Sequence, residues 1–385
     1  PFLPAVGDLK TTRARTAILP DLPDHEDRLS RYLLQQAKQQ LFREITKRKH
    51  QTSVGYRGET VVAAFYSVWR VAGLSSLNEA REDLTHLFPE WLHLNPSGTG
   101  FTTRDWDPTL NIKNLEVVRI CREEKIKILP VINNAEGGEF RPERVSRLLR
   151  NPKNRTKLIA DLRDFVLKEQ FHGINIDFEN LYRKDYDLLV LFMQELSAEF
   201  RKHDLLVTID VELNRPEIPI RQLAEHADFV IPMAYDEHYS GGEPGPIASA
   251  PWLYNSLREF AEHVPPEKTV LGIACYAYDW PDNGPAEALS FQTALHRARE
   301  HLPEHNRSSF IRFDPDALNP YFRYIDEDGK ERTVWFLDAS TAFNQMRVGR
   351  EFGFRGTALW VLGAEDPAIW HVLRKPESES PDGID

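Results

Sequence analysis

One ten-residue segment, 171–180, carries side chains whose types and spacing could do chemistry. It reads Phe-His-Gly-Ile-Asn-Ile-Asp-Phe-Glu-Asn. Gly173, Asn175, Asp177 and Glu179 alternate there with two isoleucines and a phenylalanine. A period of two predicts a β-strand with one apolar face and one face that carries an amide and two carboxylates. Buried carboxylates are costly unless they are paired or used, so the pattern indicates a functional strand.

The two acids of this strand are close enough to influence each other. Asp177 and Glu179 lie on one face, roughly 7 Å apart at Cα. While Asp177 is ionised, its charge makes Glu179 harder to ionise. A carboxylic acid that stays protonated near neutral pH can protonate a leaving sugar oxygen, as a glycosidase requires. The alternative is a strand end where solvated acids alternate by chance, which the strict apolar alternation disfavours.

The composition narrows the function classes. The chain has 385 residues, of which 41% are hydrophobic and 28% charged, and its net charge of −11 disfavours binding to nucleic acid or an anionic membrane. No apolar run approaches the ~20 residues of a membrane span. Cys121 and Cys275 form neither a disulfide framework nor a metal-ligand pattern. We therefore expect no metal and no cofactor.

The elements that must position the acids alternate in type from about residue 60 onward. Strands are predicted over 61–69, 90–95, 126–133, 173–179, 205–211, 228–235, 269–278 and 356–362. Helices are predicted over 112–124, 141–149, 155–169, 184–203, 252–263 and 340–352. Eight alternating units predict an α/β fold with a parallel sheet, and the count favours a closed (β/α)8 TIM barrel over an open doubly wound sheet.

The predicted barrel domain spans residues 60–373. Residues 1–59 are expected to form an N-terminal linker with an amphipathic helix over 24–49, and the polar tail 374–385 a disordered linker. The connection 282–339 is too long for a barrel loop, so it predicts a small α+β insertion after strand seven. Its expected parts are a helix over 289–302 and strand-like pieces at 309–313, 321–326 and 331–337, with a hairpin turn at 326–329.

Acids and aromatic residues gather where the predicted strands end. In a TIM barrel the chemistry sits at these carboxyl ends. They carry Tyr66, Trp69, Asn133, Asn134, Asp177, Glu179, Asp210, Glu212, Tyr235, Asp236, Glu237, His238, Tyr276, Tyr278, Asp279, Trp280 and Trp360. A single aromatic residue here is more often core than ligand platform. Several that converge with acids predict a carbohydrate cleft, because sugars bind through their C–H faces and hydroxyl groups.

Three of these strand ends together resemble the family 18 glycoside hydrolases. They are Gly-Ile-Asn-Ile-Asp-Phe-Glu at 173–179, Met-x-Tyr-Asp at 233–236 and the lone Trp360. The insertion, with Val-Trp-Phe-Leu-Asp at 334–338, matches as well, and the resemblance covers roughly residues 60–373. More narrowly, the chain resembles the domain fused to polysaccharide deacetylase and glycosyltransferase modules in large bacterial proteins.

The resemblance implies a retaining glycosidase that cleaves N-acetylglucosamine-containing polysaccharide through an oxazolinium ion, with no metal. Glu179 matches the general acid/base, and Asp177 matches the acid that orients the acetamido group of the substrate. Tyr235 matches the hydroxyl that holds the acetamido carbonyl, with Asp236 as the polar partner beside it. Trp360 matches the floor under the sugar at the cleavage point.

Other candidate substrate contacts rest on position alone. They are Asn175, Tyr66, Tyr276, Asp210 and Glu237. For Asp210 a structural role in the polar centre of the barrel is an equal alternative, and for Glu237 a role in capping the loop after strand six.

Two positions depart from the family pattern, which carries further acids where this chain has His172 and Asn175. We expect Asn175 to hydrogen-bond Asp177, which would then stay ionised in the free enzyme and hold up the pKa of Glu179. Asn175→Asp should then change the acid limb of the pH–rate profile. His172 falls on the opposite face at the start of the strand, so a structural or solvent-facing role is expected.

Two other functions stay open. The first is a glycan-binding module without hydrolysis in an exopolysaccharide protein, which the presence of Glu179 disfavours. The second is a metal-dependent hydrolase, which is weak because His238 near Asp236 has no second histidine at ligand spacing. By association with its substrate class, the protein is expected to be extracytoplasmic, either periplasmic or secreted, with a membrane anchor in the full-length protein as an alternative. This fragment is expected to be a monomer.

Overall fold

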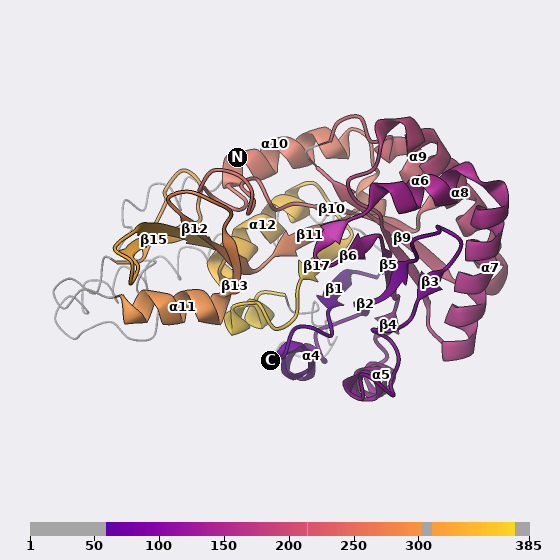
Figure 1. Ribbon diagram of the computed structural model, residues 1–385, viewed down its shortest axis with the longest axis horizontal. Coiled ribbons are helices and arrows are strands. Elements are labelled where there is room, and N and C mark those ends of the chain that lie inside the picture. The colour runs from indigo at the N-terminus through magenta and orange to yellow at the C-terminus, as the bar shows by residue number, and fades with distance from the viewer. Residues whose placement is uncertain (1–58, 214, 302–309, 374–385) are drawn as a thin grey trace, which may run out of the picture.

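The computed structural model describes residues 59–213, 215–301 and 310–373. Within them, eight parallel strands close into a barrel, because β1 pairs with β2 on one side and β17 on the other (Figure 1). The strands are β1 (Val61–Tyr66), β2 (His86–Leu94), β5 (Val131–Asn133), β8 (Gly173–Asp177), β9 (Leu206–Glu212), β10 (Phe229–Met233), β11 (Val270–Ala274) and β17 (Gly356–Trp360). The short β4 (Lys127–Ile128) precedes β5 and also pairs with β2. The predicted α/β fold and closed barrel are confirmed. The predicted N-terminal helix and C-terminal linker lie outside the described residues.

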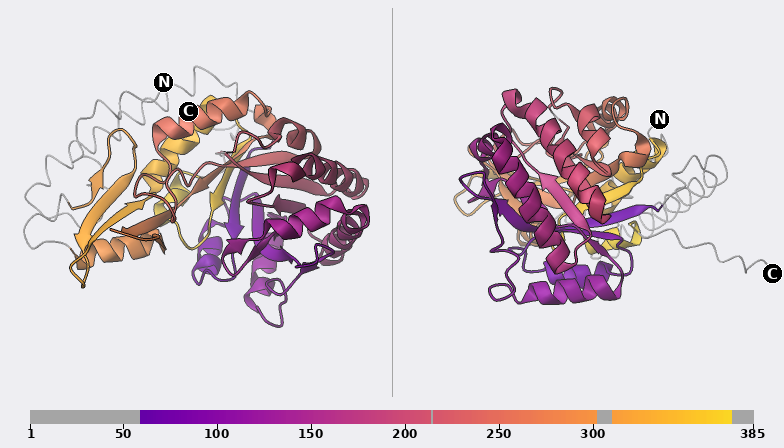
Figure 2. Two further views of the ribbon diagram at one scale, coloured as in Figure 1. Left: turned by 45° about the horizontal axis from the view of Figure 1, so that its top comes forward. Right: turned by 90° about the vertical axis from the view of Figure 1, so that its right-hand side faces the viewer.

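Helices cover the outside of this barrel, as Figure 2 shows from two sides. They are α4 (Gly73–Ala80), α5 (Lys113–Glu123), α6 (Pro142–Arg150), α7 (Pro152–Glu169), α8 (Tyr186–Phe200), α9 (Ile220–His226), α10 (Ala250–Ala261) and α12 (Ala339–Glu351). The longest shows why the local sequence becomes a helix: the side chain of Asn151 caps α7 by accepting from the Lys153 N–H, and Pro152 occupies its first turn. The sequence pattern did not predict α4 and α9, which have only eight and seven residues. None of the described helices is long and apolar enough to cross a membrane.

The alternation of side chains along each strand divides the core into two clusters. On β1, Val61, Ala63 and Phe65 point into the barrel, while Val62 and Ala64 pack toward the helices. On β8 the two isoleucines join the outer cluster, so the amide and the acid of that strand face the barrel interior. The polar face that the sequence predicted for this strand therefore points inward.

Glycine allows β8 to approach its neighbour closely. A Cβ added to Gly173 would lie 2.1 Å from the carbonyl oxygen of Leu206 on the adjacent chain segment. Any side chain here would push β8 away from β9. The first residue of the active-site strand thus helps to set its pairing.

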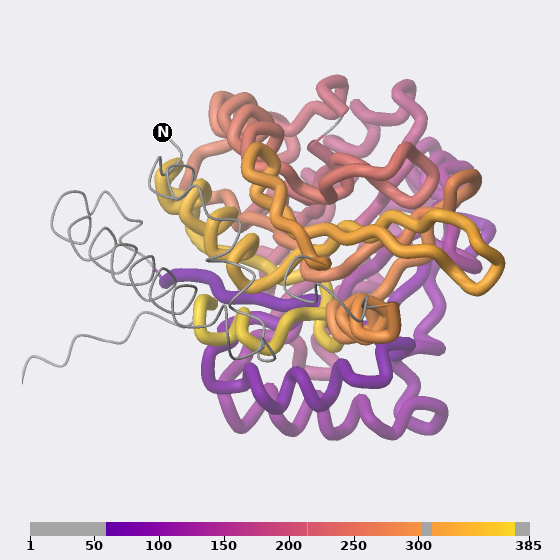
Figure 3. The backbone as a smooth tube through the Cα atoms, turned by 90° about the vertical axis from the view of Figure 1, so that its left-hand side faces the viewer, coloured from indigo at the N-terminus to yellow at the C-terminus, as the bar shows by residue number. Residues whose placement is uncertain are grey.

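The insertion forms a second sheet beside the barrel mouth (Figure 3). Its strand order is β13-β12-β16-β15-β14, and all its pairings are antiparallel. The elements are β12 (Tyr276–Pro281), β13 (Glu287–Ser290), α11 (Phe291–Glu300), β14 (Arg312–Phe313), β15 (Pro320–Ile325) and β16 (Glu331–Phe336). The hairpin turn between β15 and β16 is confirmed by the hydrogen bond from Asp326 N–H to the Lys330 carbonyl, 2.9 Å.

Two of the predicted strand extents differ most from the structure. The strand predicted over 269–278 is two strands that belong to different sheets, since β11 ends at Ala274 and β12 begins at Tyr276. The second sheet therefore starts six residues before the predicted insertion. Strand two begins at His86 rather than at residue 90. Both errors arise because an apolar run does not show where the chain changes its pairing partner.

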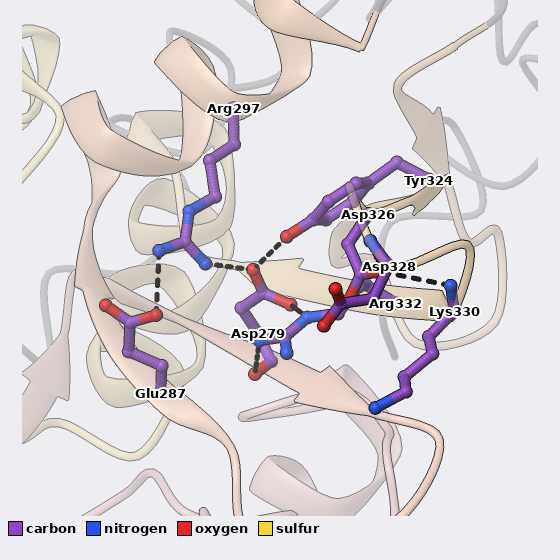
Figure 4. Close-up of polar contacts among 8 residues, drawn as sticks. All are labelled: Asp279, Glu287, Arg297, Tyr324, Asp326, Asp328, Lys330 and Arg332. Atoms are coloured by element: carbon purple, nitrogen blue, oxygen red, sulfur yellow. Dashed lines mark hydrogen bonds and ion pairs between the residues drawn. The ribbon is translucent and has the colours of Figure 1, made fainter.

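A buried ion cluster centred on Asp279 of β12 ties the insertion together (Figure 4). Arg332 of β16 donates to its Oδ1 at 2.8 Å, and the Tyr324 hydroxyl of β15 donates to its Oδ2 at 2.7 Å. Arg297 of α11 forms an ion pair with the same carboxylate. Side chains alternate along β12, so the neighbouring Tyr278 points away from the ion cluster. It packs instead in the inner hydrophobic cluster of the barrel, the one that contains Phe65.

Candidate active site

Glu179 lies two residues beyond the end of β8 and is held by the neighbouring strand end. Its backbone N–H donates to Oδ1 of Asn134 at 2.9 Å, and Nδ2 of Asn134 donates to the Glu179 carbonyl at 3.1 Å. Asn134 is fully buried, directly after β5. From the sequence, Asn134 was expected at a strand end but not among the site residues. The paired asparagines after that strand were the available signal.

Glu179 and Asp177 are both perturbed acids. Burial raises the pKa of Glu179 well above its usual range, and the charges of Asp177 and Glu212 add to this effect. Burial, with a smaller contribution from Glu212, raises the pKa of Asp177 to about 7, although a hydrogen bond with Glu179 opposes the shift. Glu179 is thus a neutral acid able to donate a proton. A pKa of about 7 does not support the expectation that Asp177 stays ionised in the free enzyme.

Asn175 does not bond to Asp177 as expected. Its Nδ2 donates to Oδ2 of Asp210 at 2.6 Å, and its Oδ1 accepts from the Thr208 hydroxyl at 2.5 Å. Both partners belong to β9, where Thr208 lies directly opposite Asn175. A neighbouring strand is about 4.8 Å away, whereas the next residue on the same face is roughly 7 Å away, so the amide bonds across the sheet.

Tyr235 and Asp236 follow β10 and face these acids. Burial raises the pKa of Tyr235 well above its usual range, and the charges of Asp210, Glu179 and Asp177 contribute. The Tyr235 hydroxyl therefore stays protonated and can donate a hydrogen bond. The backbone of Asp236 is left-handed, with φ 61°, which turns the chain sharply after the strand.

Two tyrosines of the insertion hold Asp236 in place. The hydroxyls of Tyr276 and Tyr278 both donate to its Oδ1, the second at 3.1 Å. These bonds lower the pKa of Asp236, but burial outweighs them, so that its pKa is raised. The ring of Tyr276 also packs edge-on against Tyr235, with ring centroids 6.3 Å apart. The predicted site residues Tyr235, Asp236 and Tyr276 are thus brought together.

Trp360 lies at the end of β17, partly exposed, and its ring meets Phe65 of β1 edge-on at 5.3 Å. It packs against the same cluster inside the barrel mouth as Tyr235 and Tyr276. A partly exposed indole among buried aromatic rings offers a flat apolar surface, which suits the C–H face of a sugar.

Three predicted substrate contacts are placed elsewhere or are already engaged. Tyr66 is 1% exposed and belongs to the outer cluster under the helices, so its prediction is wrong. Its neighbour Phe65 occupies the inward position. The carboxylate of Glu237 accepts from the Ser249 N–H at 2.6 Å and the Ser249 hydroxyl at 3.0 Å, which ties two loops together. Asp210 is buried and held by Asn175. For Glu237 and Asp210 the structural alternatives fit these contacts.

Two histidines that the sequence analysis discussed have structural partners. Nδ1 of His172 accepts from the Ile128 N–H at 3.1 Å, on the exposed start of β8, as expected. Nδ1 of His238 bonds the carbonyl of Glu243 at 2.9 Å. Among residues 59–213, 215–301 and 310–373, no group of three or more His, Cys, Asp or Glu side chains is arranged to hold a metal ion.

A small open pocket lies beside Glu179. Its polar lining includes Glu179, Asn180, Glu212 and Arg215, and its apolar lining comes from the ends of β8 and β9 and from α8. Arg215 pairs with Glu212 and donates to Oδ1 of Asn180 at 2.7 Å. The backbone at Glu179 and Asn180 therefore borders a small pocket between the ends of β8 and β9 and helix α8.

Comparison with known proteins gives one consistent result. The family description "Glycosyl hydrolases family 18" matches residues 61–365. YdhD of Bacillus subtilis (strain 168), which carries the name sporulation-specific glycosylase, is 28% identical over 295 residues, 74% of this chain and 67% of its own length. The cortical fragment-lytic enzyme of Bacillus cereus is 27% identical over 281 residues, 69% of this chain and 63% of its own length. The crystal structure of a chitinase from Chromobacterium violaceum superposes with a TM-score of 0.73 at 24% identity, over 82% of this chain and 98% of that one.

Proposed function

Since this chain belongs to family 18 of the glycosyl hydrolases and is a glycosidase, we propose that it cleaves N-acetylglucosamine-containing polysaccharide with retention of configuration. The observation that carries the proposal is the position of Glu179. It is a carboxylic acid with a raised pKa, two residues beyond Asp177 at the end of β8. It is near enough to Tyr235 that its charge helps to raise the pKa of that hydroxyl. Relatives named cortical fragment-lytic enzyme support the substrate class.

In the proposed first step, Glu179 protonates the glycosidic oxygen as the bond to the anomeric carbon breaks. The carbonyl oxygen of the substrate's own 2-acetamido group attacks that carbon and forms an oxazolinium ion, so no protein nucleophile is needed. This course is an exception to the two-carboxylate scheme of most glycosidases. In the second step the Glu179 carboxylate takes a proton from water, and the water attacks the same face that the leaving group left, which restores the acid and retains the configuration.

Two further residues act on the acetamido group. The carboxylate of Asp177 accepts from its N–H and stabilises the positive charge that develops there. The Tyr235 hydroxyl donates to its carbonyl oxygen and holds it near the anomeric carbon. One buried oxygen of Asp177 has no hydrogen-bond partner among the described residues, which leaves it available for this contact. Trp360 supports the sugar ring from below.

We also propose that the protein works outside the cytoplasm, where polysaccharides of this class are found. In the complete protein, linked deacetylase and glycosyltransferase modules would act on the same polymer. Fractionation of cells that express the native gene, with an antibody against residues 59–373, tests the location. Recovery with cytoplasmic markers alone would contradict it.

The first experiment compares the protein with Glu179→Gln. Both are incubated with fully N-acetylated glucosamine oligomers of β-1,4 and β-1,6 linkage, and products are identified by mass spectrometry and by NMR of the fresh anomeric centre. Cleavage by the unchanged protein alone, with the β-anomer formed first, is expected. Binding of oligomers by both proteins without cleavage would instead favour a glycan-recognition module.

A further inference from the structure

Asp177 and Asp210 lie side by side on neighbouring strands. The register pairs Asn175 with Thr208 and Ile176 with Ile209, so the next step along β8 and β9 brings Asp177 level with Asp210. Both side chains are on the inward face, because Ile176 and Ile209 belong to the outer cluster. Adjacent strands are about 4.8 Å apart, which puts the two carboxyl groups within reach of each other.

Each of these carboxyl groups has one buried oxygen with no hydrogen-bond partner in the part of the chain that the structure describes. They are Oδ1 of Asp177 and Oδ1 of Asp210. The other oxygen of Asp210 accepts from Nδ2 of Asn175. Buried polar atoms are rarely left unpaired, because the lost hydration is costly. A single proton held between these two oxygens would give both of them a partner and leave the pair with one charge instead of two.

We propose that Asp177 and Asp210 form a carboxyl dyad that shares one proton across β8 and β9, and that Asp210 is a positioning residue for the reaction. In the free enzyme, Oδ1 of Asp210 carries the proton and donates it to Oδ1 of Asp177. Its Oδ2 accepts from Asn175. Both oxygens of Asp210, Oδ1 of Asp177 and the amide of Asn175 then each have a hydrogen-bond partner. The pair of carboxyl groups has a single negative charge.

The dyad keeps Asp177 ionised when substrate binds, which is when its negative charge is needed. When substrate enters, Asp177 turns from Asp210 to the acetamido N–H, and the proton stays on Asp210. Asp210 on β9 thus serves as the neutral carboxylic acid. Asn175, on the neighbouring strand β8, cannot take this role because its side chain is an amide. The inference deepens the proposed function, on which its kinetic test rests, while its spectroscopic test does not.

The surroundings of the dyad favour a shared proton. Burial is the main cause that raises the pKa of both carboxyl groups, and the charge of Asp177 contributes to the shift of Asp210. Hydrogen bonding by Asn175 opposes the shift of Asp210. The titratable groups on the elements around the pair are Glu90, His93, Asp105, Glu179, Glu212, Tyr235 and Asp236. Most of them are acids or phenols, and His93 is engaged by Asp105 at 2.8 Å.

The test moves the acid from one strand to the other. Asp210→Asn removes the shared proton, N175D adds a third acid, and the double variant N175D/D210N exchanges amide and acid between β8 and β9. We expect Asp210→Asn to shift the acid limb of the kcat/KM profile by about one pH unit to higher pH, because an amide is a weaker hydrogen-bond donor to the Asp177 carboxylate than a carboxylic acid. The double variant should return the limb to within about 0.3 unit of the unchanged protein. Asp187→Asn, on the exposed face of α8, is the matched acid-to-amide control.

Infrared spectroscopy of the free protein tests the dyad without turnover. Asp210→Asn should remove one protonated-carboxyl band, Asp177→Asn should shift that band because the Asp210 proton loses its acceptor, and Asp187→Asn should do neither. The bands of other protonated acids, such as Glu90 and Glu179, should remain in every variant. Should Asp210→Asn fail to fold by circular dichroism, the Asp177→Asn spectrum still decides. An unchanged profile and signal in Asp210→Asn, or a double variant no better than the sum of its singles, overturns the dyad. Absence of cleavage in every protein with the infrared result intact would overturn only the proposed function.

Discussion

The hydroxyl of Tyr278 donates to Oδ1 of Asp236 at 3.1 Å, although Tyr278 belongs to the insertion sheet and Asp236 follows barrel strand β10. Tyr276 of the same insertion strand donates to the same oxygen. The insertion is therefore part of the candidate site, because it orients an acid that the barrel supplies. The buried ion cluster around Asp279 holds the strand that carries both tyrosines.

Tyr278→Phe should impair catalysis while leaving the fold intact. The lost bond lowers the pKa of Asp236, so its removal raises that pKa further and moves the acid limb of the pH–rate profile to higher pH. A hydrogen bond to a charged group contributes about 1.5–3 kcal/mol, which corresponds to a loss in kcat/KM of about tenfold or more. Tyr324→Phe, which loses a hydroxyl bound to Asp279 instead, should change thermal stability but not the pH profile. Equal profiles for both variants would remove Tyr278 from the site.

Tyr235→Phe and Tyr66→Phe separate the site from the core. Both remove one hydroxyl from a tyrosine after a barrel strand, but Tyr235 faces the acids and Tyr66 packs under the helices. Tyr235→Phe should reduce kcat by about 10²-fold, as expected for a donor to charge that develops in the reaction. Tyr66→Phe should retain kcat within about twofold. Steady-state kinetics on N-acetylglucosamine oligomers gives the comparison, and similar losses in the two variants would contradict the placement of Tyr66.

Arg332→Met should destabilise the insertion strongly, because it leaves the buried carboxylate of Asp279 short of a partner. Because Arg297 and Tyr324 still contact this carboxylate, the expected loss is that of a hydrogen bond to a charged group, about 1.5–3 kcal/mol. Arg323→Met is the control on β15: its guanidinium is 64% exposed and 3.5 Å from Glu331, so its removal should cost less than about 1 kcal/mol. Urea denaturation measures both. Comparable losses would show that the ion cluster does not hold the insertion.

Glu90→Gln should change how stability depends on pH. Burial, followed by the charge of Asp177, raises the pKa of Glu90 from 4.5 to about 8. Between these values the folded protein holds a proton that the unfolded chain has released, so the stability from this group is complete at low pH and is lost as pH rises toward 8. Each such proton contributes a slope of up to about 1.4 kcal/mol per pH unit. In urea titrations between pH 5 and 8, the variant should show a smaller dependence of the unfolding free energy on pH. The difference should not exceed the contribution of about one proton. An unchanged slope would mean that Glu90 ionises normally.

Much of the site could be predicted from local sequence because a strand has a fixed period. The pattern of residues 173–179 placed the amide and the acids on one face, and that face does point into the barrel. The eight alternating units predicted the closed barrel, and the Asp-Glu-Asp-Gly turn predicted the β15–β16 hairpin. These features depend on neighbours within a few residues along the chain.

What the sequence by itself determined was therefore which residues share a face and which acid ends the strand. Only the tertiary structure decided that Tyr66 points outward to the helices and that the amide of Asn175 bonds to β9. It also decided where β11 ends and the first strand of the insertion sheet begins. The physical reason is that an alternating strand has two equivalent faces, and pairing with its neighbours selects one of them. A polar side chain then bonds to the nearest partner across the sheet, which is far away in the sequence. For this protein that partner is Asp210, and it turns a departure from the family pattern into a testable arrangement of two acids.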